Sequence, residues 1–319
     1  FIKILGRSSM TNLTVDQAVS KAQSLAANGN TATALGLYKK VLQYFPDHKD
    51  AKKGIAELYE RNKVVPSTPS PQTLQRLANL FRKGEKQELA SQAELLIKQF
   101  PDSFMAWIFM GTANMGLERT EAAVSDFERA CKLNPLYPDA HNSLGIALKT
   151  IGKSDDAIDA YDKAISLKSD YAEAHYNKAL VLSQKGDINK AIESYKSAIN
   201  FQPNYIDANL NLGTLLSDQG YPDQAIAAFE AVIKTNPEHI RALNNMGNAL
   251  AQLDDFERAE CVFKKALSID SNHAELHNNL AVVLTKKGRL SEALDYFQNA
   301  ISINPDYSDA HNNLGWIKA

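Results

Sequence analysis

Residues 206–239 read IDANLNLGTLLSDQGYPDQAIAAFEAVIKTNPEH, and the pattern of this segment returns every 34 residues along the chain. Small residues recur at that step, at Gly111, Gly145, Ala179, Gly213, Gly247, Ala281 and Gly315. Two further registers hold alanines at 123, 157, 191, 225, 259 and 293, and aromatic residues at 127, 161, 195, 229, 263 and 297. A fixed period of about 20 to 50 residues is typical of solenoids and other repeat architectures.

Each 34-residue unit contains two segments with the periodicity of an amphipathic helix. In the unit at 138–171, Leu144 and Leu148 follow helical spacing in the first half, and Tyr161 and Ile165 do so in the second. Gly152 separates the two halves, and Ser154 after it is a typical N-cap residue for the second helix. Such a pair buries its apolar face only against its neighbours, so we expect an all-α stack of antiparallel helix pairs.

The unit at 206–239 carries Leu212-Gly213, Ala225, Phe229 and Pro237 at positions that are typical of the tetratricopeptide repeat. The chain therefore resembles tetratricopeptide-repeat proteins. The resemblance implies a right-handed superhelical solenoid of antiparallel helix pairs, in which the first helix of each unit lines a concave inner wall.

The repeat register divides the chain into five expected segments. In order, they are a cloning remnant at 1–9, an N-terminal repeat unit with an extra helix at 10–62, a Pro-rich linker at 63–71, seven tandem repeats at 70–307 and the truncated start of a further repeat at 308–319. The last segment lacks a second helix, which predicts that the native protein continues past Ala319. We expect its uncovered apolar residues, Leu314 and Trp316 among them, to form a homo-oligomer contact.

Composition argues against several classes of partner. The 319 residues include 35 basic and 37 acidic ones, a formal net charge of -2, which gives no electrostatic reason to expect nucleic acid or an anionic membrane surface. No apolar run approaches the roughly 18 residues of a membrane span. Only two cysteines occur, Cys131 and Cys261, in separate repeats, so we expect free thiols and a cytoplasmic location.

Asparagines recur on the expected inner wall, at Asn142, Asn177, Asn211, Asn244, Asn245, Asn248, Asn278, Asn279, Asn312 and Asn313. An Asn side chain carries donors and an acceptor, so it can pair with the backbone of an extended peptide. The ladder resembles the asparagine-lined inner surface of the repeats of O-GlcNAc transferases, which implies a groove that grips peptide backbone. The alternative is that these amides only bond the neighbouring helix, because buried amides need partners in either case.

Four histidines share one repeat position, at His141, His175, His277 and His311. Equivalent helices of neighbouring repeats lie on the order of 10 Å apart, too far to share one metal ion, so we expect structural histidines. The sequence has no Gly-rich phosphate loop, nucleophile elbow or Cys/His cluster. We therefore expect no catalytic residue, metal or cofactor in this chain.

Three functions remain open from the sequence. The favoured hypothesis is a protein-protein interaction scaffold that binds an extended peptide or a partner protein in the Asn-lined groove. The second is the substrate-targeting arm of a larger enzyme, because the resemblance extends to repeats that precede glycosyltransferase, sulfotransferase or oxygenase domains. The third is a self-assembling structural scaffold. The residues encoded after position 319 would discriminate the first two.

Overall fold

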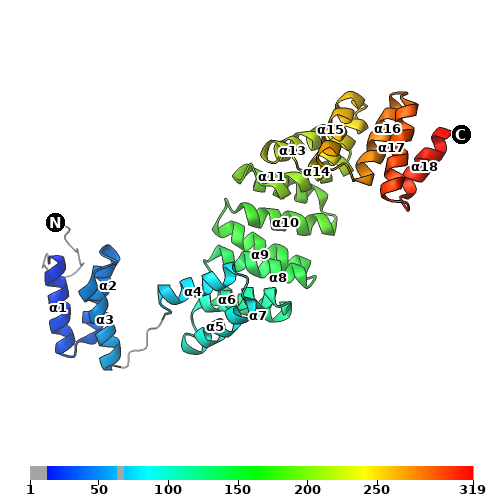
Figure 1. Cartoon of the computed structure of the whole chain (residues 1–319). Coiled ribbons are helices and arrows are strands. Elements are labelled where there is room, and N and C mark those ends of the chain that lie inside the picture. Colours follow the sequence, from blue (N-terminus) through cyan, green and yellow to red (C-terminus); the bar gives the residue numbers. More distant parts are fainter. Residues whose placement is uncertain (1–12, 63–67, 319) are drawn as a thin grey trace. The chain divides into compact units, whose positions relative to one another are not determined.

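The computed structural model describes residues 13–62 and 68–318, and every regular element in these ranges is a helix (Figure 1). The chain divides into two compact units, residues 1–75 and residues 76–319. The expected cloning remnant at 1–9 and the first five residues of the expected linker, 63–67, lie outside the described residues.

The first unit contains three helices and the start of a fourth. They are α1 (Val15–Ala27), α2 (Thr31–Tyr44), α3 (Lys49–Asn62) and α4 (Pro71–Arg82), which spans the boundary between the units. A capping box begins α1, where Thr14 and Gln17 exchange hydrogen bonds between side chain and backbone. Tyr38 of α2 and Leu58 of α3 are buried in a small apolar core.

The second unit continues as a series of helices joined by short turns. They are α5 (Lys86–Gln99), α6 (Phe104–Gly116), α7 (Thr120–Leu133), α8 (Pro138–Thr150), α9 (Ser154–Leu167), α10 (Ala172–Lys185), α11 (Ile188–Phe201), α12 (Ile206–Asp218), α13 (Pro222–Thr235), α14 (Ile240–Gln252), α15 (Phe256–Ile269), α16 (Ala274–Lys286), α17 (Leu290–Ile303) and α18 (Ser308–Lys318). From α6 to α17 they form antiparallel pairs, and the second helix of each pair packs against the first helix of the next. The expected all-α solenoid of helix pairs is confirmed.

First helices of successive pairs also touch each other, as α8 touches α10 and α14 touches α16. In the described chain no comparable contact joins successive second helices. The first helices therefore line the closer side of the stack, which we call the inner face.

Glycine permits the close approach of the two helices in a pair. A Cβ atom at Gly145 would lie 2.5 Å from the ring of Tyr161, and one at Gly213 would lie 2.6 Å from the ring of Phe229. Both rings are fully buried. The recurrence of small and aromatic residues in the sequence is thus one packing contact repeated along the stack.

The turns within the pairs need a left-handed residue. Gly152 adopts a φ of 81° between α8 and α9, and two non-glycine residues, Glu118 and Asp254, adopt φ values of 62° and 58° at the equivalent position. The expectation that Ser154 caps α9 is wrong, because Ser154 is the first residue of that helix and the N-cap is Lys153. The left-handed glycine sets where the helix begins, one residue earlier than the cap chemistry indicated.

In the described residues, no helix has the length and apolarity that crossing a membrane requires. Cys131 and Cys261 are both free thiols, as their separation along the chain predicts.

Candidate functional site

All ten asparagines of the ladder lie on first helices of their units. They are Asn142 on α8, Asn177 on α10, Asn211 on α12, Asn244, Asn245 and Asn248 on α14, Asn278 and Asn279 on α16, and Asn312 and Asn313 on α18. Because each first helix touches the next, amides on neighbouring helices come within reach of each other.

Direct amide bridges join successive first helices. In each bridge an Nδ2 atom donates to the Oδ1 atom of an asparagine 35 residues earlier, which lies on the preceding first helix, one repeat and one further position back. Such bridges run from Asn177 to Asn142 (3.1 Å), from Asn279 to Asn244 (3.0 Å) and from Asn313 to Asn278 (3.1 Å).

Where the acceptor position holds another residue, the donor finds a different partner. Asn211 donates to the hydroxyl of Tyr176 at 3.2 Å, again 35 residues earlier. Asn245 would face Leu210, which has no acceptor, and instead donates to Oγ1 of Thr214 at 3.1 Å. Through these bonds the amides link neighbouring repeats. The alternative that the asparagines bond the neighbouring helix therefore describes part of the ladder.

Burial separates the asparagines into two groups. Asn142, Asn177, Asn244 and Asn278 are buried, and their bonds lie within the stack. The others are half-buried or exposed, at Asn211, Asn245, Asn248, Asn279, Asn312 and Asn313. The side chain of Asn248 forms no hydrogen bond with the described part of the chain. Peptide binding by the second group stays a prediction.

Two open pockets lie on the inner face, at equivalent places two repeats apart. The α10–α12 pocket has a volume of about 220 Å³ and is lined by Gln184, Tyr195 and Asn211 among others. The α14–α16 pocket has a volume of about 320 Å³ and is lined by Gln252, Phe263 and Asn279, the residues 68 positions later. Asn248 also lines the second pocket, where Leu180 lines the first.

A row of acids that the sequence patterns above did not single out lies one helical turn before the asparagines. This carboxylate row consists of Asp139, Glu173, Asp207, Glu275 and Asp309. Its members recur at the 34-residue step, with Arg241 in the one intervening place, so the period could have revealed them. Asn142 donates to Oε1 of Glu173 at 3.3 Å, and Asn244 donates to Oε1 of Glu275 at 2.8 Å.

The recurrent histidines contact the turn that precedes their own helix. Each Nε2 atom donates to a backbone carbonyl six residues earlier, from His141 (3.0 Å), His175 (3.0 Å), His277 (2.9 Å) and His311 (2.8 Å). Trp107 and Asn209 make the same bond at the same repeat position, at 2.8 Å and 3.1 Å. A donor at this position therefore anchors the turn, and in the α14 repeat the buried Leu243 occupies the position instead. No group of three or more His, Cys, Asp or Glu side chains within 13–62 and 68–318 is arranged to hold a metal ion.

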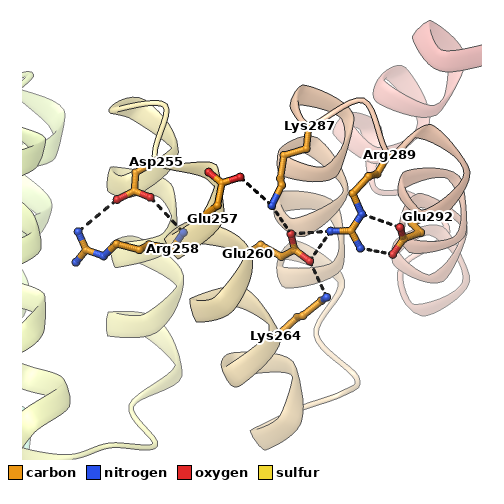
Figure 2. Close-up of polar contacts among 8 residues, drawn as sticks. All are labelled: Asp255, Glu257, Arg258, Glu260, Lys264, Lys287, Arg289 and Glu292. Atoms are coloured by element: carbon orange, nitrogen blue, oxygen red, sulfur yellow. Dashed lines mark hydrogen bonds and ion pairs between the residues drawn. The ribbon is translucent and has the colours of Figure 1, made fainter.

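The second helices α15 and α17 carry acids that are paired within the chain (Figure 2). Glu260 on α15 accepts hydrogen bonds from Lys264 at 2.6 Å, Lys287 at 2.8 Å and Arg289 at 2.7 Å. Lys287 and Arg289 belong to the turn between α16 and α17, so the cluster ties α15 to the next repeat. Burial alone would raise the pKa of Glu260, but these bonds outweigh it and lower the pKa from 4.5 to about 2.

The contribution of Glu260 to stability should depend on pH. Because its folded-state pKa is depressed, the stabilisation is fully present above pH 4.5 and is lost as the pH falls from there toward about 2. We expect the variant Glu260→Gln to be less stable than the native chain near neutral pH and to approach it as the pH falls. Urea unfolding at a series of pH values measures the gap. The exposed Glu193→Gln is the control, and a gap at Glu260 that stays constant with pH would contradict the assignment.

Family models of the tetratricopeptide repeat match most of the chain. Models described as "Tetratricopeptide repeat" match residues 19–65, 106–135, 127–159, 210–274 and 274–307. A model described as "TPR repeat" matches 150–186 and 179–220. The matches therefore run without a break from residue 106 to residue 307. No curated protein sequence matches the chain.

Solved structures share the fold at low sequence identity. The C-terminal part of a TPR repeat-containing protein from Cytophaga hutchinsonii has a TM-score of 0.64 and 17% identity, with 76% of this chain and 99% of that one covered. YrrB, described as a TPR protein with an unusual peptide-binding site, has a TM-score of 0.55 and 24% identity, with coverages of 59% and 96%. PilF of Pseudomonas aeruginosa has a TM-score of 0.55 and 19% identity, with coverages of 67% and 97%. At these identities the likeness shows the fold alone.

Proposed function

Because the chain is a tetratricopeptide-repeat protein, and so a protein-interaction scaffold, we propose that its inner face binds an extended peptide segment of a partner between α8 and α16. The observation that carries the proposal is the pair of equivalent pockets, each with a half-buried asparagine at the same repeat position. Amide groups that recur at a fixed spacing can pair with the regularly spaced backbone groups of an extended peptide.

The spacing of the pockets fits an extended chain. Successive first helices lie about 10 Å apart, so pockets two repeats apart are separated by about 20 Å. An extended peptide rises about 3.3 Å per residue, so about six residues span that distance. Side chains alternate along such a peptide, and residues six apart point to the same side. One peptide could therefore place a side chain in both pockets.

The half-buried amides can hold the backbone between these side chains. Asn211 donates from Nδ2 to Tyr176, and Asn279 donates from Nδ2 to Asn244 and accepts at Oδ1 from Asn278, while an amide has two donor hydrogens and an acceptor oxygen with two lone pairs. The side chain of Asn248 in the α14–α16 pocket forms no hydrogen bond within the described chain. These groups pair with backbone atoms, so they favour extended segments over particular side chains.

Random 12-residue peptides displayed on phage provide the test. We expect the native chain to select binders whose affinity falls about tenfold or more in the triple variant Asn211→Ala, Asn248→Ala, Asn279→Ala, because roughly three hydrogen bonds of about 0.5 to 1.5 kcal/mol each are lost. Fluorescence anisotropy with the selected peptides measures the change, and far-UV circular dichroism checks that the variant is folded.

The matched control removes three exposed asparagines elsewhere, with Asn189→Ala, Asn204→Ala and Asn299→Ala. This control should bind like the native chain. Equal affinities for both triple variants, or a library that yields no binder, would refute the proposed function.

A further inference from the structure

The carboxylate row has no cationic partner in the part of the chain that the structure describes. Its members Asp139, Glu173, Asp207, Glu275 and Asp309 are all exposed, and none forms an ion pair with the described residues. Some acids on the second helices do have such partners, since Asp162 pairs with Lys178 and Glu260 with Lys287 and Arg289. The row differs from these acids in that none of its five members has a counter-charge among the described residues.

The row belongs to the same face as the pockets. On α12, Asp207, Asn211, Thr214 and Asp218 follow one another at intervals of four, three and four residues, which places them on one stripe of the helix. The last three of these residues line the α10–α12 pocket. A rise of 1.5 Å per residue puts Asp207 about 6 Å along the helix from Asn211.

A buried hydroxyl beside the row also has no partner. Tyr161 is fully buried, and its hydroxyl oxygen forms no hydrogen bond within the described chain. It occupies the repeat position of Tyr195 and Phe263, which line the two pockets. Burial, and then the charge of Glu173, raises the pKa of Tyr161, so the hydroxyl lies within the field of the row.

Acids of the row also contribute to raised pKa values of other tyrosines. Burial, and then the charges of Glu275 and Asp309, raises the pKa of Tyr307. Burial, and then the hydrogen bond with Asp139, raises the pKa of Tyr171. Nζ of Lys168 lies 4.6 Å from the centroid of the Tyr171 ring, so the chain itself places one cation over a ring beside the row.

We propose that the segment bound on the inner face is basic, with Lys or Arg side chains that reach the carboxylate row. This inference rests on the proposed function. Side chains alternate along an extended chain that rises about 3.3 Å per residue, so basic residues about six positions apart point to the same side and lie about 20 Å apart, the distance between members of the row two repeats apart. Arg241 interrupts the row at α14 and disfavours a basic residue opposite that repeat.

Three synthetic 12-residue peptides test the charge preference. All have Ser at two of every three positions, and the third position holds Lys, Gln or Glu. We expect the Lys peptide to bind about tenfold or more tightly than the Gln peptide at about 0.15 M salt, the Glu peptide to bind most weakly, and the preference to shrink as salt is raised.

Variants that neutralise the carboxylates test whether the preference for the Lys peptide comes from the carboxylate row. Glu173→Gln, Asp207→Asn and Glu275→Gln together should weaken the Lys peptide about tenfold and leave the Gln peptide within about twofold. The control removes the same charge from exposed second-helix acids, with Glu128→Gln, Glu193→Gln and Asp295→Asn, and should change neither affinity by more than about twofold.

The outcomes distinguish a failure of the basic preference from a failure of the proposed peptide-binding function. Equal affinities for the Lys and Gln peptides, or an equal loss in both triple variants, would overturn the basic preference while peptides selected from the phage library still bind. Failure of all three peptides together with an empty phage selection would overturn the peptide-binding function itself, and the basic preference with it.

Discussion

Replacing Phe229 with Ala is expected to lower the free energy of unfolding by about 3 to 5 kcal/mol. The Phe229 side chain is fully buried, lies against Gly213 of its own helix pair and belongs to the apolar core that continues through the neighbouring pairs. Its removal leaves a cavity that rigid helices on each side cannot close. Urea unfolding followed by far-UV circular dichroism measures the loss.

The control for this change is Leu136→Ala. Leu136 is 76% exposed, so its truncation should cost less than about 0.5 kcal/mol. A loss at Phe229 as small as the loss at Leu136 would show that the aromatic register does not form the core.

Gly213→Val is expected to destabilise the chain by about 2 to 3 kcal/mol, through crowding instead of a cavity. A Cβ atom at Gly213 would lie 2.6 Å from the ring of Phe229, closer than any carbon contact allows. The branched side chain of Val cannot turn away within a helix, because its χ1 angle is restricted. Thermal and urea unfolding measure the effect, and peptide binding at the adjacent α10–α12 pocket should weaken with it.

Gly213→Ala is the matched control for the crowding. The equivalent repeat positions hold Ala179 and Ala281, both fully buried, so helix pairs of this kind can separate enough to admit one methyl group. We expect a change within about 1 kcal/mol, because the better helix propensity of Ala offsets part of the strain. If Val were tolerated as well as Ala, the close approach of α12 and α13 would not be limited by this contact.

The fold could be predicted from the sequence because one contact repeats. The recurrence of Gly145, Tyr161 and their equivalents predicts which residues pack against each other in a helix pair. The helical periodicity predicts which face of each helix is apolar. The first residue of α9 was harder to predict, because the left-handed conformation of Gly152, and not the side chain of Ser154, determines where the helix begins. Glu118 and Asp254 take the same backbone conformation without the glycine that would announce it.

The sequence predicted which residues make up the candidate site, but it did not predict which hydrogen bonds they form. The 34-residue step placed Asn142 and Asn177 on the same wall, but their hydrogen bond joins positions 35 apart and depends on how far one helix is shifted along the next. That shift is a property of packing between helices. The carboxylate row was equally visible as a period, and its lack of counter-charges became apparent only once the ion pairs of the second helices were in place.

The confinement of contacts to adjacent repeats has a consequence for how the chain acquires its structure. The hydrogen bonds between first helices join residues only 31 or 35 positions apart, and helices otherwise pack against their immediate neighbours. Closing such short loops costs little chain entropy, and the mean sequence separation of contacts is low, which is the condition for rapid folding. Any helix pair can serve as a nucleus, and order can then spread in both directions from it.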